Sequence, residues 1–203
     1  MVFDPSYPDI DEDNFPKKNW DNFYGDVEEQ LPPAMPEPLG GEVILRLFVD
    51  TDYAGDGATR RSRTGFIIFL NEAPIYWFFK KQTRVENSVF GSEFIAMQTG
   101  LEVVQGIRYK LRIMGAPLNT PTYIYGDNMS VIYNTSRPES TLKKKANSVC
   151  YHYIREAVAA DECRIGHIST HENPADPLTK PLPNSAKRDK LVGKVLHFFS
   201  NEE

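Results

Sequence analysis

Cysteine is scarce in this chain of 203 residues, which has two, Cys150 and Cys163. Two cysteines are too few for a disulfide framework, and this pair lacks the spacing of a zinc site. The low count therefore excludes the class of small secreted proteins that disulfides hold together. We expect two reduced, partly buried thiols.

Long hydrophobic runs are also missing. No apolar run approaches the roughly 20 residues that are needed to cross a bilayer. The N-terminus has Asp4 and Pro5 where a signal peptide would carry positive charge. The sequence thus predicts a soluble protein that stays inside the cell and has no membrane partner.

Charge is unevenly divided along the chain, whose formal net charge is −5. Residues 1–43 hold 11 acids and 2 lysines, which leaves 17 acids and 21 bases for residues 44–203. The two parts therefore carry −9 and +4. A basic globular part with an acidic arm fits a polyanionic partner.

Residues 1–42 form this arm, which is rich in acids and proline and has no sustained hydrophobic periodicity. It is interpreted as a connector or leader, and Gly40-Gly41 marks the start of a single domain over residues 43–203. The arm also has six aromatic residues. They leave two alternatives open: a disordered tail, or an extended segment anchored along the domain surface.

The pattern of the domain predicts an α/β fold. Residues 43–49, 64–70 and 75–80 are expected to form three antiparallel strands. A helix follows, because apolar residues recur at spacings of 4, 3, 4 and 3 at Phe90, Phe94, Met97, Leu101 and Val104. The remaining elements are expected to be a strand at 122–125, a helix from about 128, a basic helix at about 142–159, a strand at 164–169 and a helix at about 185–199. This order implies one mixed sheet flanked by helices.

Four carboxylates fall at the ends of these elements or at the edge of the core: Asp50, Glu93, Asp127 and Asp176. Taken singly, each has an ordinary explanation as a turn former, a helix cap or a solvated side chain. Taken together, they would repel one another unless cations neutralised them, and Mg²⁺ and Mn²⁺ take such oxygen ligands. Spacing alone does not bring the four together.

Six blocks of sequence carry a family resemblance: FVDTDYAG, RRSRTGFIIFLNEAPIYW, KKQTRVENSVFGSEFIAM, YGDNMSVI, YHYIREAV and HISTHENPADPLTKPL. Their order and approximate spacing resemble those of the ribonuclease H domain at the C-terminal end of the Pol polyprotein of copia-type LTR retrotransposons. The resemblance covers about residues 44–182. It implies a ribonuclease-H-like fold, a five-stranded mixed sheet with three antiparallel strands followed by helix, strand, helices, strand and helix.

The resemblance also implies an activity, which is hydrolysis of the RNA strand of RNA–DNA hybrids with two Mg²⁺ ions, or Mn²⁺ in their place. Asp50 would bridge both ions, with Asp52 as the second choice for this position. Glu93 and Asp127 would hold one ion, and Asp176 the other. A histidine before the last acid would correspond to His171 rather than His167. The block NSVFGSE lacks the upstream acid that the family usually has.

The hybrid would be gripped by basic and polar side chains. The expected contacts are Arg60, Arg61, Arg63, Ser92, Asn128, Lys143, Lys144, Lys145 and Arg155. The reverse transcriptase domain of the same polyprotein would be a partner, in a cytoplasmic retrotransposon particle or in the nucleus. Two alternatives remain: an inactive ribonuclease-H-like module of a truncated retroelement that binds or bridges nucleic acid, and another nuclease or integrase of the same fold.

Overall fold

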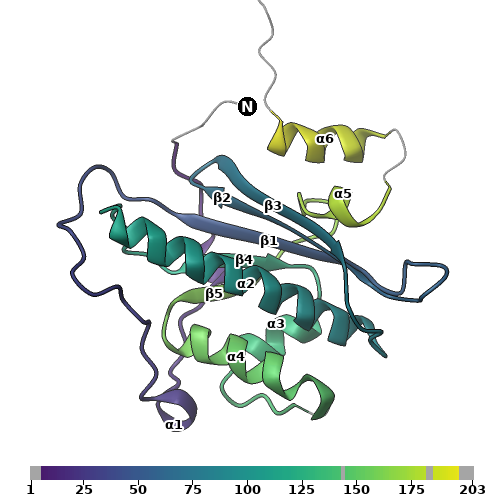
Figure 1. Ribbon diagram of the computed structural model, residues 1–203, viewed down its shortest axis with the longest axis horizontal. Helices are drawn as coiled ribbons and strands as arrows, with labels where there is room; N and C mark the ends of the chain where they lie inside the picture. Colours follow the sequence, from purple (N-terminus) through teal and green to yellow (C-terminus); the bar gives the residue numbers. More distant parts are fainter. Residues whose placement is uncertain (1–5, 143–144, 182–184, 197–203) are drawn as a thin grey trace, which may run out of the picture.

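The structure is a computed structural model that describes residues 6–142, 145–181 and 185–196. Its centre is one mixed sheet of five strands in the order β3-β2-β1-β4-β5 (Figure 1). The strands are β1 (Leu45–Asp52), β2 (Arg63–Leu70), β3 (Ala73–Lys81), β4 (Thr122–Gly126) and β5 (Cys163–His167). The first three are antiparallel, whereas β4 pairs parallel with β1 and β5 pairs parallel with β4. The predicted five-stranded mixed sheet, with three antiparallel strands first, is confirmed.

Helices cover both faces of the sheet. Figure 1 shows α2 (Val89–Ile113), α3 (Met129–Ser136) and α4 (Ser148–Ala159) on one face and α5 (Asp176–Thr179) and α6 (Ala186–Val195) on the other. Because the sheet lies between two layers of helices, β1 is buried along almost its whole length. This explains why its sequence is a nearly continuous apolar run rather than an alternating one.

Two clusters of buried side chains hold the layers together. The larger cluster lies between the sheet and α2, α3 and α4, and it includes four of the five residues of the predicted stripe, Phe94, Met97, Leu101 and Val104. Phe90, the fifth, is partly buried against it. The smaller cluster lies on the opposite face and includes Phe48, Ile67 and Phe69.

Some element boundaries differ from those expected. Strand β1 continues through Asp52, so that Asp50 lies inside a strand rather than at its end. The basic helix begins at Ser148 instead of residue 142, because a short 3-10 helix, η2 (Lys145–Asn147), precedes it. The last helix ends at Val195, and the expected part at residues 197–199 lies outside the described residues.

The described part of the arm lies along the domain, where it forms η1 (Glu12–Asn14) and α1 (Asp21–Tyr24). The Phe15 side chain is buried, and its ring makes edge contacts with Tyr123 and Tyr125 at centroid distances of 5.0 and 4.9 Å. Asn14 donates to the backbone oxygen of His167 at 2.8 Å and accepts from its N–H at 2.9 Å. The arm thereby satisfies backbone groups of β5, the edge strand.

Further along, the arm is held by stacking and ion pairs. The guanidinium carbon of Arg155 lies 4.6 Å from the centroid of the Trp20 ring. Glu29 accepts from Arg108 at 2.8 Å and from Arg112 at 2.6 Å. Of the two alternatives for the arm, the described residues follow the anchored one.

Two further expectations concern the thiols and the membrane. Cys150 and Cys163 are both buried and free, as predicted. Among the helices in the described part of the chain, none is long and apolar enough to span a membrane.

Candidate active site

Asp50 lies near the end of β1 with 1% of its surface exposed. Its Cα partner on β2 is Gly65, and a Cβ at that glycine would lie 2.5 Å from the Thr179 methyl carbon. The absence of a side chain at Gly65 therefore lets α5 approach the sheet. Thr179 of α5 donates its hydroxyl to Asp50. Burial raises the pKa of Asp50 to about 6, against the opposing effects of Thr179 and Lys180.

Glu93 reaches the same place from the first turns of α2. Ser88 caps this helix by accepting from the backbone N–H of Gly91. The Glu93 side chain is 7% exposed and accepts a hydrogen bond of 2.7 Å from the Thr51 hydroxyl. Burial raises the pKa of Glu93 to about 8, and the neighbouring Asp127 and Asp50 raise it further. Without a bound cation, the protonated form of Glu93 is therefore favoured at neutral pH.

Asp127 follows the last residue of β4 and completes a cluster of three acids. It accepts a hydrogen bond of 2.8 Å from the Thr170 hydroxyl. One carboxylate oxygen each from Asp50, Glu93 and Asp127 lies within 4.8 Å of the others. The predicted convergence thus holds for three acids that are up to 77 positions apart in the sequence.

Asp176, the fourth predicted acid, is the first residue of α5 and is 1% exposed. It does not belong to the group of three, but Lys180 connects it to that group. The Lys180 ammonium lies 3.2 Å from Asp176 Oδ1 and 3.4 Å from Asp50 Oδ2. Lys187 of α6 lies 2.7 Å from Asp176 Oδ2.

The donor set of the three acids fits a divalent metal ion. Its ligands are all carboxylate oxygens, which Mg²⁺ and Mn²⁺ prefer over sulfur or imidazole donors. Three buried or half-buried carboxylates this close would repel one another as anions, and a cation removes that cost. The chemistry of the cluster therefore supports the predicted metal site.

The other predicted residues of the catalytic group lie further out. Asp52 forms an ion pair of 2.9 Å with Arg63 and is not a member of the cluster. His167 ends β5, where its backbone pairs with Asn14. His171 is exposed in the loop between β5 and α5, and its catalytic role stays a prediction.

The residues predicted to bind nucleic acid are only partly at the surface. Arg60 and Arg61 are exposed in the turn after β1, and Lys145 is exposed in η2. Asn128 is half-buried, and its side chain caps α3 by accepting from the N–H groups of Ser130 and Val131. Lys143 and Lys144 lie outside the described residues.

Two predicted contacts are contradicted by burial. Arg155 is 2% exposed, and its guanidinium donates to the backbone oxygens of Asn134, Arg137 and Pro138. It stabilises the loop after α3 and cannot reach a substrate. Ser92 is fully buried, and its hydroxyl donates to the backbone oxygen of Val89 at 2.8 Å.

A groove of about 480 Å³ lies between the start of α2 and α3, and its lining includes Asn128, the residue after Asp127. It is lined by hydroxyl and amide side chains together with a few apolar ones: Ser88, Val89, Phe90, Asn128, Ser130, Asn134, Thr141 and Leu142. This lining itself carries no acidic side chain.

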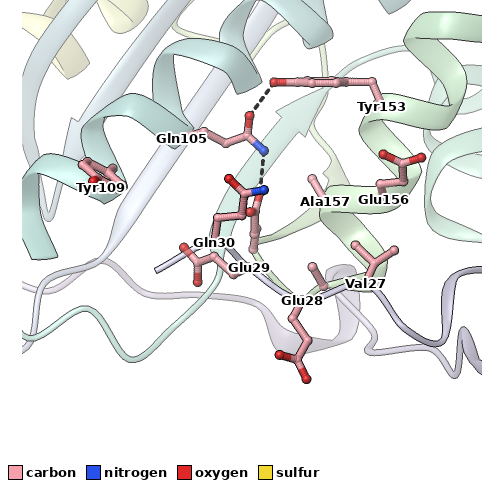
Figure 2. A pocket seen from close by; sticks show the side chains of 11 residues that line it. Val27, Glu28, Glu29, Gln30, Gln105, Tyr109, Tyr153, Glu156 and Ala157 are labelled. Atoms are coloured by element: carbon pink, nitrogen blue, oxygen red, sulfur yellow. Dashed lines mark hydrogen bonds between the residues drawn. The ribbon is translucent and has the colours of Figure 1, made fainter. Parts of the chain in front are cut away.

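A second cavity, of about 360 Å³, has the opposite character (Figure 2). It lies between the arm, α2 and α4, and four glutamates line it: Glu28, Glu29, Glu156 and Glu162. Tyr153 donates to Gln105, which in turn donates to Glu162. So acidic a lining would repel phosphate, which excludes this cavity as a site for nucleic acid.

The residues that orient the acids were not predicted from the sequence. Thr51, Thr170 and Thr179 each donate a hydroxyl to one of the carboxylates, while Lys180 and Lys187 contact Asp176. Thr179 and Lys180 were visible as the TK of the block ADPLTK. Nothing in the local pattern marks Lys187, which lies in an ordinary amphipathic helix.

Comparison with known proteins supplies relatives by sequence, although no family model matches the chain. The chain is 35% identical over 147 residues to the retrovirus-related Pol polyprotein from transposon RE1 of Arabidopsis thaliana, a match that covers 72% of this chain and 10% of that protein. It is 36% identical over 164 residues to the Pol polyprotein from transposon TNT 1-94 of Nicotiana tabacum, covering 80% and 12%. The chain thus spans about a tenth of the length of these relatives.

Solved structures agree on the fold. The N-terminal RNase H domain of rv2228c from Mycobacterium tuberculosis superposes with a TM-score of 0.51 at 14% identity, covering 75% of this chain and 96% of that one. LC11-RNase H1, solved in complex with an RNA/DNA hybrid, gives 0.51 at 16% identity, covering 68% and 93%. Sequence and fold together show that the chain belongs, over the matched residues, to the Pol polyproteins of copia-type retrotransposons, as a segment with the ribonuclease-H-like fold.

Proposed function

We propose that the chain is a ribonuclease H, which hydrolyses the RNA strand of RNA–DNA hybrids with two divalent metal ions during reverse transcription of a retrotransposon. The observation that carries this proposal is the cluster of Asp50, Glu93 and Asp127 within 4.8 Å, with Asp176 close by. These acids stand at the end of the sheet in a fold of the ribonuclease H type, in a relative of Pol polyproteins.

The acids would divide the two ions between them. Asp50 lies between the two groups, because it belongs to the cluster and also shares Lys180 with Asp176. Asp50 would therefore contribute to both ions, Glu93 and Asp127 to one, and Asp176 to the other. When bound, Mg²⁺ or Mn²⁺ would supply a nucleophile at neutral pH and stabilise the charge that develops on the leaving oxygen.

The surrounding hydroxyls prepare the acids for this task. Thr51 and Thr170 each hold one oxygen of Glu93 or Asp127, which fixes the direction of the remaining lone pairs. Thr179 does the same for Asp50. The cluster is consequently oriented before a substrate arrives, so that little reorganisation is needed at the moment of reaction.

The substrate would lie along the groove between the start of α2 and α3. Its hydroxyl and amide groups, among them Ser88, Asn128 and Asn134, suit hydrogen bonds to 2′-hydroxyls and phosphate oxygens. Exposed Arg60 and Arg61 in the turn after β1 would add phosphate contacts that carry no sequence information. We propose His171 as a further catalytic group that approaches from its exposed loop. The polymerase segment of the same polyprotein would present the hybrid, in a cytoplasmic particle or in the nucleus.

The decisive experiment uses a labelled RNA–DNA hybrid, with RNA–RNA and DNA–DNA duplexes as controls, in Mg²⁺ and in EDTA. We expect metal-dependent loss of the RNA strand of the hybrid only. Asp127→Asn should abolish it, whereas Asp26→Asn, at an exposed acid of the arm, should retain it.

The opposite result would favour the alternative function. Tight binding of the hybrid by the wild type, with no cleavage in Mg²⁺ or Mn²⁺, would identify a module that only binds or bridges nucleic acid. Cleavage that persists in Asp127→Asn would refute the assignment of the acids.

A further inference from the structure

Asp176 differs from Glu93 and Asp127 in that ammonium groups contact it. Both of its oxygens contact ammonium groups, Oδ1 with Lys180 at 3.2 Å and Oδ2 with Lys187 at 2.7 Å. Glu93 and Asp127, in contrast, accept hydrogen bonds from the neutral hydroxyls of Thr51 and Thr170. One half of the site is therefore already neutralised by the chain itself.

Lys180 lies where it can serve two acids at once. Its ammonium is 3.4 Å from Asp50 Oδ2 and 3.2 Å from Asp176 Oδ1. An ion shared by Asp50 and Asp176 would need the same oxygens. The ammonium and such an ion would also repel each other at this range, so each lowers the affinity of the two carboxylates for the other.

The two lysines come from different elements and can withdraw. Lys180 follows α5 directly, and its side chain is 38% exposed. Lys187 lies in the first turn of α6, and its side chain is 27% exposed. Because both ammonium groups sit on long, flexible stems that reach solvent, they can leave Asp176 without disturbing the buried core.

We propose that Lys180 and Lys187 are tethered cations that compete with the second divalent ion for Asp176 and Asp50. They thereby set the metal concentration at which this half of the site fills. They are positioning residues, since they act through the carboxylates. The inference rests on the proposed function in that it takes the four acids to be a metal site.

Charge-neutral variants test the competition directly. In Lys187→Gln and in Lys180→Gln, the weaker of two Mn²⁺ sites should bind about 2- to 5-fold more tightly, which is the scale expected for losing one partly exposed charge pair. Lys187→Arg keeps the charge and should bind Mn²⁺ as the wild type does. Lys190→Gln is the matched control, because it removes the same charge from α6 at a lysine that pairs with Glu172 instead.

The measurement is Mn²⁺ binding without nucleic acid, by calorimetry and by electron paramagnetic resonance of the free ion, so that it does not depend on cleavage. Unchanged or weaker binding in both glutamine variants would overturn the inference, as would an equal gain in Lys190→Gln. Lower affinity for the hybrid with unchanged Mn²⁺ binding would mean that the lysines contact phosphate, and would also overturn it. The two failures can be told apart. If the wild type binds Mn²⁺ and the lysine variants bind it no more tightly, only this inference fails, whereas a wild type that binds no Mn²⁺ would contradict the proposed function as well.

Discussion

Glu93→Gln should stabilise the metal-free protein while abolishing its activity. The carboxylate is 7% exposed, and burial raises its pKa from 4.5 to about 8. The folded state therefore binds this proton more tightly than the unfolded state does, so the group's cost to stability is small at low pH and grows as pH rises from 4.5 to about 8. Glutamine keeps the shape and the hydrogen bond from Thr51 but never ionises.

The magnitude follows from the shift in pKa. At about 1.36 kcal/mol per pKa unit, the shift corresponds to a cost that rises by about 4 kcal/mol between about pH 5 and about pH 9. The stability of Glu93→Gln relative to the wild type should rise by this amount over the same range. Urea unfolding in EDTA at both pH values measures it, with Glu102→Gln, at an exposed acid of the same helix, as the control.

Metal should reverse the comparison. Mg²⁺ should bind the ionised acids of the folded wild type and so stabilise that protein, whereas the variant lacks one ligand and should gain less stability.

In EDTA, a stability difference between the two proteins that is the same at both pH values would refute the reasoning, because it would mean that the buried carboxyl group does not change its protonation on folding.

Three further predictions concern the scaffold. Phe15→Ala should lower the free energy of unfolding by about 3–5 kcal/mol, because it removes a buried ring from between Tyr123 and Tyr125; urea unfolding tests this, and a loss under about 1 kcal/mol would mean that the arm is dispensable. Gly65→Ala should reduce cleavage at least about 10-fold and cost about 1–3 kcal/mol, since its Cβ would push Thr179 away from Asp50; full activity would contradict this. Cys150 and Cys163 should react with a thiol reagent only after denaturation, because both are buried; labelling of the native protein would show otherwise.

Local pattern was sufficient to predict the order of elements and the candidate acids. The apolar run before Asp50 indicated a buried strand, and the helical stripe placed Glu93 at its border, where the structure has it. The family resemblance then assigned all four acids, Asp127 and Asp176 included, to one site. Three of these four acids form the cluster.

Contacts between distant segments could not be predicted in this way. Thr51 and Glu93 are 42 positions apart, and Asp50 and Thr179 are 129 apart. Arg155 shows the reverse error, because a basic helix suggests a solvated face, whereas three backbone oxygens and the Trp20 ring surround this guanidinium. The sequence shows that a side chain is basic, but it does not show whether that side chain binds a substrate or another part of the same chain.

The acidic arm gives the uneven charge of the chain a structural meaning. Its Glu29 pairs with both Arg108 and Arg112, which lie in the last part of α2, while Glu93 lies in the first part. Residues 93 and 112 are separated by about 28 Å at a rise of 1.5 Å per residue. Under the proposed function, the arm thereby reduces the positive charge at residues far from the acids, where a substrate phosphate would otherwise bind unproductively. At the end of the sheet where the carboxylates converge, Lys180 and Lys187 are paired with Asp176 instead, so that bound divalent cations would have to supply the positive charge that attracts a polyanion there.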